Sequence, residues 1–217
     1  MSKPPAKRGP ALREQMLHAA KAVFLEAGFE RASMDRIAAQ AGTTKRTLYA
    51  HFVRKEDLFL AVFDLILDLQ LHHLGQPAEY APGPEPALVL FCARFLETVL
   101  SSRPLRLLRL AIAETDRFPQ GGTVRLHEAL LETVQVRVAG FLAQHWLLTP
   151  AASAAAAQLL LGQLLYPRFT RALFGATEPA ATHSDELGAS PAIDLAPIRR
   201  LVAAVLHGAG TDPAGAD

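Results

Sequence analysis

The sequence predicts an all-α fold, in which a small N-terminal three-helix unit is joined by a connecting helix to a larger helical domain. Apolar residues recur at helical spacing along nearly all of the 217 residues, and almost no segment alternates as a strand does. The composition, with 50% apolar and 20% charged residues, is typical of a globular protein. A Pro- and Gly-rich segment at 76–86 interrupts the helical pattern.

Local signals predict the first three helices. A helix over 12–27 should end at Gly28, because glycine readily takes the positive φ that closes a helix. Ser33 can cap a second, short helix, Gly42 allows a tight turn, and Thr44 can cap a third helix in which residues 48 and 52 face the core. Residues 33–52 therefore have the order of a helix-turn-helix.

The remaining segments continue the helical pattern. The connecting helix should run over 56–74, with its buried side formed by Leu58, Val62, Leu65, Ile66 and Leu69. Pro167 should kink or weaken the helix that contains it. The sequence further predicts helices over 86–102, 104–117, 123–148 and 150–174, a loop over 175–190, a last helix over 195–207 and a flexible tail.

The third helix carries polar side chains suited to the major groove of DNA. Lys45, Arg46 and Thr47 lie at its N-terminal end, which in a helix-turn-helix points at base edges. Tyr49 and His51 follow on its outward side, where a backbone phosphate would be the partner. An ordinary three-helix unit with a solvated polar face remains an alternative, with Tyr49 as a packing residue and His51 facing solvent.

The distribution of charge favours a nucleic-acid partner for the N-terminal part alone. Residues 1–60 hold 11 Lys and Arg against 6 Asp and Glu, whereas residues 61–217 hold 11 against 15. The net charge of +1 therefore hides a basic module followed by a mildly acidic one. Chance asymmetry in a solvated surface would also produce such a split.

The motif order resembles the N-terminal domain of the TetR family of bacterial transcriptional regulators. The resemblance covers residues 10–72 and rests on Gly28-Phe29, on the run from Ser33 through Phe52, and on Lys55-Glu-Asp-Leu-Phe. Thr43 and Ala50 depart from the residues that many members carry there. The resemblance implies base-reading positions at Thr44, Lys45, Arg46 and Thr47, and phosphate-contacting positions at Ser33, Tyr49, His51 and Lys55.

Further expectations follow from the resemblance. It implies a homodimer that binds a near-palindromic double-stranded DNA operator, mostly as a repressor, and releases it when a small-molecule effector enters the C-terminal helical pocket. The chain then divides into a basic arm (1–10), a helix-turn-helix domain (11–55), an effector-binding and dimerisation domain (56–208) and a tail (209–217). A ligand-independent architectural DNA-binding protein is an alternative.

Two groups of apolar residues in the C-terminal part are candidates for the dimer interface and the pocket. Plain core or surface is an alternative for each group. The dimer candidates are Leu160, Leu164, Phe169, Leu201 and Val205, and the pocket candidates are Phe91, Phe95, Glu114, Phe118, Phe141 and His145, with Trp146 beside them.

The sequence predicts neither a metal nor a cofactor. Asp64, Asp68 and His72 share a helix face, but a solvated stripe explains them better than a metal site. Cys92, the single cysteine, should be a buried structural thiol. Without a secretory signal or an apolar run of about 20 residues, we expect a cytoplasmic protein with no membrane partner. A helical enzyme with a basic extension is disfavoured, because no phosphate loop or nucleophile elbow is found.

Overall fold

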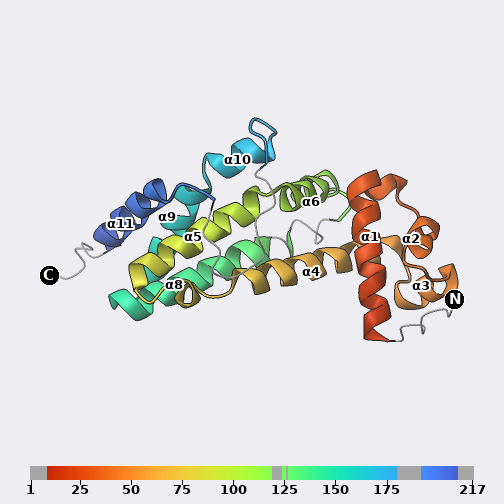
Figure 1. Ribbon diagram of the computed structural model, residues 1–217, viewed down its shortest axis with the longest axis horizontal. Coiled ribbons are helices and arrows are strands. Elements are labelled where there is room, and N and C mark those ends of the chain that lie inside the picture. Colours follow the sequence, from red (N-terminus) through yellow and green to blue (C-terminus); the bar gives the residue numbers. More distant parts are fainter. Residues whose placement is uncertain (1–8, 119–123, 126, 180–191, 210–217) are drawn as a thin grey trace. The chain divides into compact units, whose positions relative to one another are not determined.

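The computed structural model describes residues 9–118, 124–125, 127–179 and 192–209, and within these ranges the chain is helical and contains no strand. The predicted all-α class is confirmed. No helix among them is both long and apolar enough to cross a bilayer. The α-helices are labelled in Figure 1. The elements are α1 (Pro10–Arg31), α2 (Met34–Gln40), α3 (Lys45–His51), α4 (Lys55–Leu74), the 3-10 helix η1 (Pro77–Glu79), α5 (Pro84–Leu100), α6 (Ser102–Ala113), the π-helix η2 (His127–Glu132), α8 (Thr133–Trp146), α9 (Pro150–Leu165), α10 (Arg168–Leu173) and α11 (Leu195–Ala209).

The chain forms two compact units that do not follow one another simply along the sequence. The first unit comprises residues 1–68 with 110–125, and the second comprises 69–109 with 126–217. Two helices, α4 and α6, therefore each contribute residues to both units. The sequence did not reveal that the segment after α6 packs with the N-terminal helices, and the functional boundary expected between residues 55 and 56 stays a prediction.

The local signals at the start of the chain are confirmed. Helical geometry in α1 is broken at Gly28, whose φ of 76° lies in the region that favours glycine. The Ser33 hydroxyl accepts a hydrogen bond from the Arg36 N–H at 3.2 Å, so it caps α2. The turn between α2 and α3 passes through Gly42, which also has a positive φ. The Thr44 hydroxyl then caps α3 by accepting from the Thr47 N–H at 3.1 Å.

An aromatic cluster forms the core of the first unit. Phe59 of α4 lies at its centre, with its ring centroid 4.9 Å from that of Phe63, 5.0 Å from Phe29, 5.1 Å from Phe24 and 5.5 Å from Phe118. Most of these contacts have the edge-to-face geometry that aromatic rings prefer. Phe118 joins from the segment after α6, and this contact helps to place that segment in the first unit.

The buried side of α4 differs in part from the prediction. Leu58, Val62 and Ile66 are buried as expected. Leu65 and Leu69, by contrast, are only half-buried. Three large side chains that were not assigned to the core are buried on this helix instead. These side chains are Phe59, Phe63 and Leu67.

Helix α5 is the central helix of the second unit. Its side chains are buried around most of its circumference, and polar residues such as Arg94 and Glu97 are buried with the apolar ones. Cys92 is among them, and burial raises the pKa of its thiol to about 12. A thiol with this pKa is almost entirely protonated near neutral pH, which agrees with a structural role. Around α5, helix α11 packs against both α5 and α9, and α9 packs against α8.

Proline divides the segment predicted as one helix over 150–174. Helix α9 ends at Leu165 and α10 begins at Arg168. Pro167 has no N–H to donate to the preceding turn, and its ring clashes with that turn, so the predicted kink is a complete break. The segment predicted over 123–148 is likewise two elements, η2 and α8. Much of the predicted loop over 175–190 lies outside the described residues.

Three of the five side chains predicted at a dimer interface lie instead in the protomer's own core. Leu160, Leu164 and Val205 are 1%, 4% and 5% exposed, so they are unavailable to a second chain. Phe169 and Leu201 are half-buried. The apolar residues recur at helical spacing as predicted, but these three side chains pack within the second unit. The large exposed apolar side chains of α9 and the residue that follows it are Leu159, at 54%, and Tyr166, at 68%.

Candidate nucleic-acid interface

Helix α3 is held to the first unit by its inner face. Leu48 is completely buried and Phe52 is 4% exposed, so they anchor the middle and the C-terminal end of the short helix. Helix α1 supports the turn before it, because the Gln15 side-chain amide donates to the Ala41 carbonyl at 2.8 Å. The Arg13 guanidinium also lies 5.1 Å from the Phe52 ring centroid, in cation–π range. These contacts fix which side of α3 faces outward.

The outward side of α3 presents the predicted base-reading cations to solvent. Lys45 and Arg46 are exposed at the first two positions of the helix. Arg46 has no hydrogen-bond or ion-pair partner within the described part of the chain. Lys45 is bound to the Asp35 carboxylate of α2, which raises the pKa of Lys45 by hydrogen bonding and by charge. The end of α3 thus presents one uncommitted guanidinium and one ammonium paired with a carboxylate.

The predicted hydroxyl and phosphate-contacting residues lie beside these cations. The Thr44 and Thr47 hydroxyls hydrogen-bond to each other at 2.7 Å, and the Thr44 hydroxyl also caps α3. Tyr49 is 41% exposed, with its ring centroid 6.0 Å from the Lys45 ammonium. His51, in the last turn of α3, is exposed. Ser33 caps α2, and its hydroxyl lies at the helix N-terminus, a position suited to a phosphate.

Lys55 is held differently from the prediction that it contacts phosphate. Its ammonium donates to the carbonyls of Phe29, Glu30 and Ala32 at 2.9, 3.3 and 3.1 Å. It also lies 4.3 Å from the centroid of the Phe29 ring. The three N–H groups of the ammonium have three carbonyl acceptors, so its hydrogen-bonding capacity is satisfied inside the first unit. In this structure Lys55 donates to carbonyls at the end of α1, and its predicted phosphate contact stays a prediction.

Replacing Lys55 by alanine should therefore lower stability more than it lowers affinity. We expect the free energy of unfolding to fall by about 1–3 kcal/mol, because three carbonyls, two of them in half-buried hydrogen bonds, lose their donor. Urea denaturation followed by far-UV circular dichroism measures this loss. The dependence of DNA affinity on salt should keep its slope. A slope reduced by about 1 with unchanged stability would instead show that Lys55 contacts a phosphate.

The carboxylates of the possible metal face are occupied or dispersed. Asp64 pairs with Arg125, whose Nη1 lies 2.5 and 2.6 Å from the two carboxylate oxygens. Asp68 is exposed, and His72 belongs to the second unit although it lies on the same helix. Among the described residues no group of three metal-ligating side chains occurs.

The six side chains predicted to line one pocket do not belong to one unit. Glu114 and Phe118 lie in the first unit, where Phe118 packs on Phe29 and Phe59. Phe91, Phe95, Phe141 and His145 lie in the second unit, and the Phe141 and His145 rings are 4.5 Å apart. Phe118 thus packs in the aromatic cluster of the first unit, and the pocket lining stays a prediction. A surface groove of about 400 Å³ between α5 and α11 contains none of the six.

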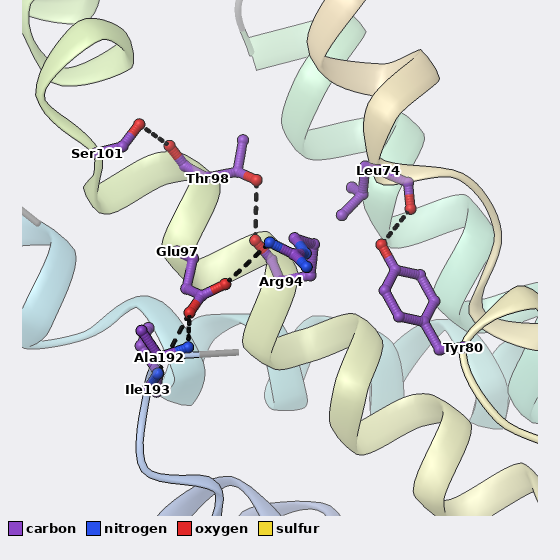
Figure 2. A network of polar contacts seen from close by, with 8 residues as sticks. All are labelled: Leu74, Tyr80, Arg94, Glu97, Thr98, Ser101, Ala192 and Ile193. Atoms are coloured by element: carbon purple, nitrogen blue, oxygen red, sulfur yellow. Dashed lines mark hydrogen bonds and ion pairs between the residues drawn. The ribbon is translucent and has the colours of Figure 1, made fainter. Parts of the chain in front are cut away.

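A buried polar network crosses the core of the second unit, and its residues are drawn in Figure 2. Arg94 and Glu97 of α5 are 5% and 3% exposed, and the Arg94 Nη1 lies 3.4 Å from the Glu97 carboxylate. The other Glu97 oxygen accepts the backbone N–H groups of Ala192 and Ile193 (Figure 2). Tyr80 lies near Arg94, and burial raises the pKa of its hydroxyl to about 12. Glu97 thus fixes the segment that precedes α11.

Two family models match the chain, one in its N-terminal part and one in its C-terminal part. The model for bacterial regulatory proteins of the TetR family matches residues 16–62. The model for the C-terminal domain of AefR-like transcriptional repressors matches residues 86–195, which is just over half of the chain. The chain belongs to the TetR family. It is thus a DNA-binding transcriptional regulator and not an enzyme.

Individual relatives of this TetR-family regulator agree with that assignment. The HTH-type transcriptional activator FasR of Mycolicibacterium smegmatis is 46% identical over 56 residues, which cover only 26% of either chain. A TetR-family regulator from Mesorhizobium loti is 26% identical, with a TM-score of 0.66 and coverage of 94% of this chain and 97% of that one. The flavonoid-responsive regulator FrrA is 25% identical, with a TM-score of 0.68 and coverage of 93% and 96%.

Two features of this TetR-family protein were missed in the sequence. Asp35 pairs with Lys45 across the helix-turn-helix, although ten residues separate them in the chain. Arg117 pairs with Glu30 and lies 5.1 Å from the Phe29 ring centroid, next to Phe118. Neither contact follows a helical or strand spacing. Only opposite charge between Asp35 and Lys45 could have suggested the first pair.

Proposed function

We propose that this TetR-family regulator is a homodimeric repressor that releases a near-palindromic operator when a small molecule binds in the second unit. The observation that carries the proposal is the end of α3, where Leu48 and Phe52 anchor the helix while Lys45 and Arg46 remain exposed. The match to AefR-like repressors supports repression over activation. Such a protein acts in the bacterial cytoplasm, where operator DNA lies.

Within this proposal, the base-reading positions are those at the start of α3. Arg46 is suited to guanine, because a guanidinium donates in parallel to O6 and N7. Thr44 and Thr47 can share their hydroxyls between the cap and a base. Ser33, Tyr49 and His51 hold the phosphates. We leave Lys55 out of this set because its three protons are already donated to backbone carbonyls.

The proposed dimer would place two α3 helices on successive turns of one DNA face. Half-sites in such complexes lie about 34 Å apart or a multiple of that distance. We assign the interface to the exposed face of α9, where Leu159 and Tyr166 stand among small residues such as Ala155 and Gly162. Small residues let two helices approach closely, and the two apolar side chains would be covered.

The effector would act by favouring one of two arrangements of the protein. A ligand shifts such an equilibrium only if it binds one arrangement more tightly than the other. Helices α4 and α6 contribute to both units and are thus the connections through which a shift would pass. FrrA is described as flavonoid-responsive, so flavonoids are the first compounds to test for release of DNA.

Selection from a random duplex library tests the proposal, followed by affinity measurements with Arg46→Ala. We expect wild type to select a near-palindromic site, and Arg46→Ala to lose about 1–3 kcal/mol of discrimination at one base pair of each half-site. Arg54→Ala is the matched control, because it removes the same charge from the first unit outside α3. It should leave base preference intact. A wild-type protein that prefers no sequence over random duplex would overturn the proposal.

A further inference from the structure

Asp35 and Lys45 form a close ion pair on the exposed side of the helix-turn-helix. The Lys45 Nζ lies 2.8 Å from one Asp35 oxygen and 3.1 Å from the other. Asp35 stands in the first turn of α2, and Lys45 is the first residue of α3. Their side chains are 65% and 59% exposed. The pair therefore belongs to the surface that offers α3 to DNA.

Stability does not explain the pair. Exposed ion pairs contribute little to folding, because water and salt screen the charges and the side chains lose freedom. The carboxylate should also oppose binding, since it stands on a surface that must approach phosphates. The first turn of α2 suits a carboxylate through the helix dipole, and a group on DNA that needs an acceptor would give Asp35 a second role.

The edge of a G·C base pair in the major groove supplies such a group next to an acceptor. Guanine offers the acceptors N7 and O6, and cytosine offers its N4 amino group as a donor. Guanine O6 and cytosine N4 are hydrogen-bonded to each other, so they lie about 2.9 Å apart. The Lys45 nitrogen and the Asp35 oxygens have nearly the same separation. The pair thus presents a donor and an acceptor at the spacing of the base-pair edge.

An A·T pair matches the two side chains less well. Lysine could donate to thymine O4 while aspartate accepts from adenine N6, at a similar spacing. The neighbour of O4 is then the thymine methyl group, whereas the neighbour of guanine O6 is a second acceptor, N7. The ammonium therefore makes one more hydrogen bond at G·C, and there its positive charge does not face a methyl group.

We propose that Asp35 and Lys45 together read one G·C base pair in each half-site, with Lys45 donating to guanine and Asp35 accepting from the cytosine N4 amino group. The inference rests on the proposed operator binding and adds a specificity-determining residue on α2. It makes the reading surface composite, because one of its base contacts comes from outside α3.

The test uses the full chain and the site selected by wild type from a random duplex library. Affinities are measured for wild type, Asp35→Ala, Lys45→Ala and the double variant, on that site and on every single-base-pair change. We expect both single variants to lose about tenfold discrimination at the same base pair. The double variant should lose scarcely more than either one, because the two residues act on one base pair.

Modified bases then separate the two contacts. 7-Deazaguanine removes the N7 acceptor, and 2-pyrimidinone in place of cytosine removes the N4 amino group while leaving the rest of the ring. Loss of the amino group should weaken wild type about tenfold more than it weakens Asp35→Ala. Loss of N7 should weaken wild type more than Lys45→Ala. Each comparison uses the same duplex for both proteins, so altered duplex stability cancels.

Glu26→Ala is the matched control, because it removes a carboxylate that pairs with Arg36 at 2.6 Å in the same unit but on α1. It should change no base preference, and circular dichroism should show that all variants fold. If Asp35→Ala binds every sequence more tightly and keeps its base preferences, Asp35 is only a repulsive charge and the inference fails while operator binding stands. If wild type selects no site, the proposed operator itself fails.

Discussion

Replacing Phe59 by alanine should lower the free energy of unfolding of the first unit by about 3–5 kcal/mol, the range observed when a buried phenylalanine is truncated. Phe59 is 1% exposed and touches four other phenylalanine rings. Alanine would leave a cavity among rings that come from α1, α4 and the segment after α6. Because whole domains are stable by only about 5–15 kcal/mol, DNA binding should be lost on mild heating.

Urea denaturation followed by far-UV circular dichroism would measure this loss. Phe59→Leu is the graded control, since it retains most of the apolar volume and should cost about 1 kcal/mol. Val53→Ala, at a side chain that is 75% exposed in the same unit, should change stability by less than about 0.5 kcal/mol. A Phe59→Ala protein as stable as Val53→Ala would mean that the aromatic cluster does not hold the first unit together.

Replacing Glu97 by alanine should cost roughly 3 kcal/mol in the second unit, because the change removes a buried carboxylate with several donors. Glu97 accepts hydrogen bonds from Arg94 and from two backbone N–H groups. Arg94 is itself 5% exposed, so its positive charge would lose a counter-charge in a region from which water is excluded. The segment before α11 would lose its anchor in the same step.

Trp146 is the only tryptophan of the chain and lies in the second unit, so its fluorescence during urea denaturation reports on this change. Glu97→Gln should be intermediate, because its amide oxygen can still accept an N–H but carries no charge. Glu85→Ala, at an exposed carboxylate on the same helix, is the matched control and should be nearly neutral. Equal midpoints for Glu97→Ala and Glu85→Ala would contradict the predicted role.

The features that could be predicted from the sequence are those in which a residue acts on its immediate neighbours in the chain. The caps by Ser33 and Thr44 and the positive φ at Gly28 and Gly42 were all predicted, because hydroxyl and glycine effects reach only a few residues along the chain. Helix–turn–helix order followed from these signals. The family motif then added the direction in which α3 faces.

The packing partner of a side chain could not be predicted from the sequence. Leu160 and Leu164 lie in a true apolar stripe, but periodicity does not say whether the stripe packs on its own chain or on another. Phe118 is an aromatic residue of the kind that lines apolar pockets. It packs on Phe29 and Phe59, which are far from it in the sequence. A lysine suits phosphates and carbonyls equally well, so the position of Lys55 needed the structure.

Residues 110–125 belong to the first unit, and this affects the design of hybrid regulators that carry the DNA-binding part of this protein. Transferring only residues 1–68 of this chain to another repressor would leave Phe118 and Arg125 behind in the donor chain. Phe29 and Phe59 would then meet a foreign side chain, and Asp64 would lose its cation. A functional hybrid should transplant both segments together, so the portable DNA-reading part of this protein is discontinuous.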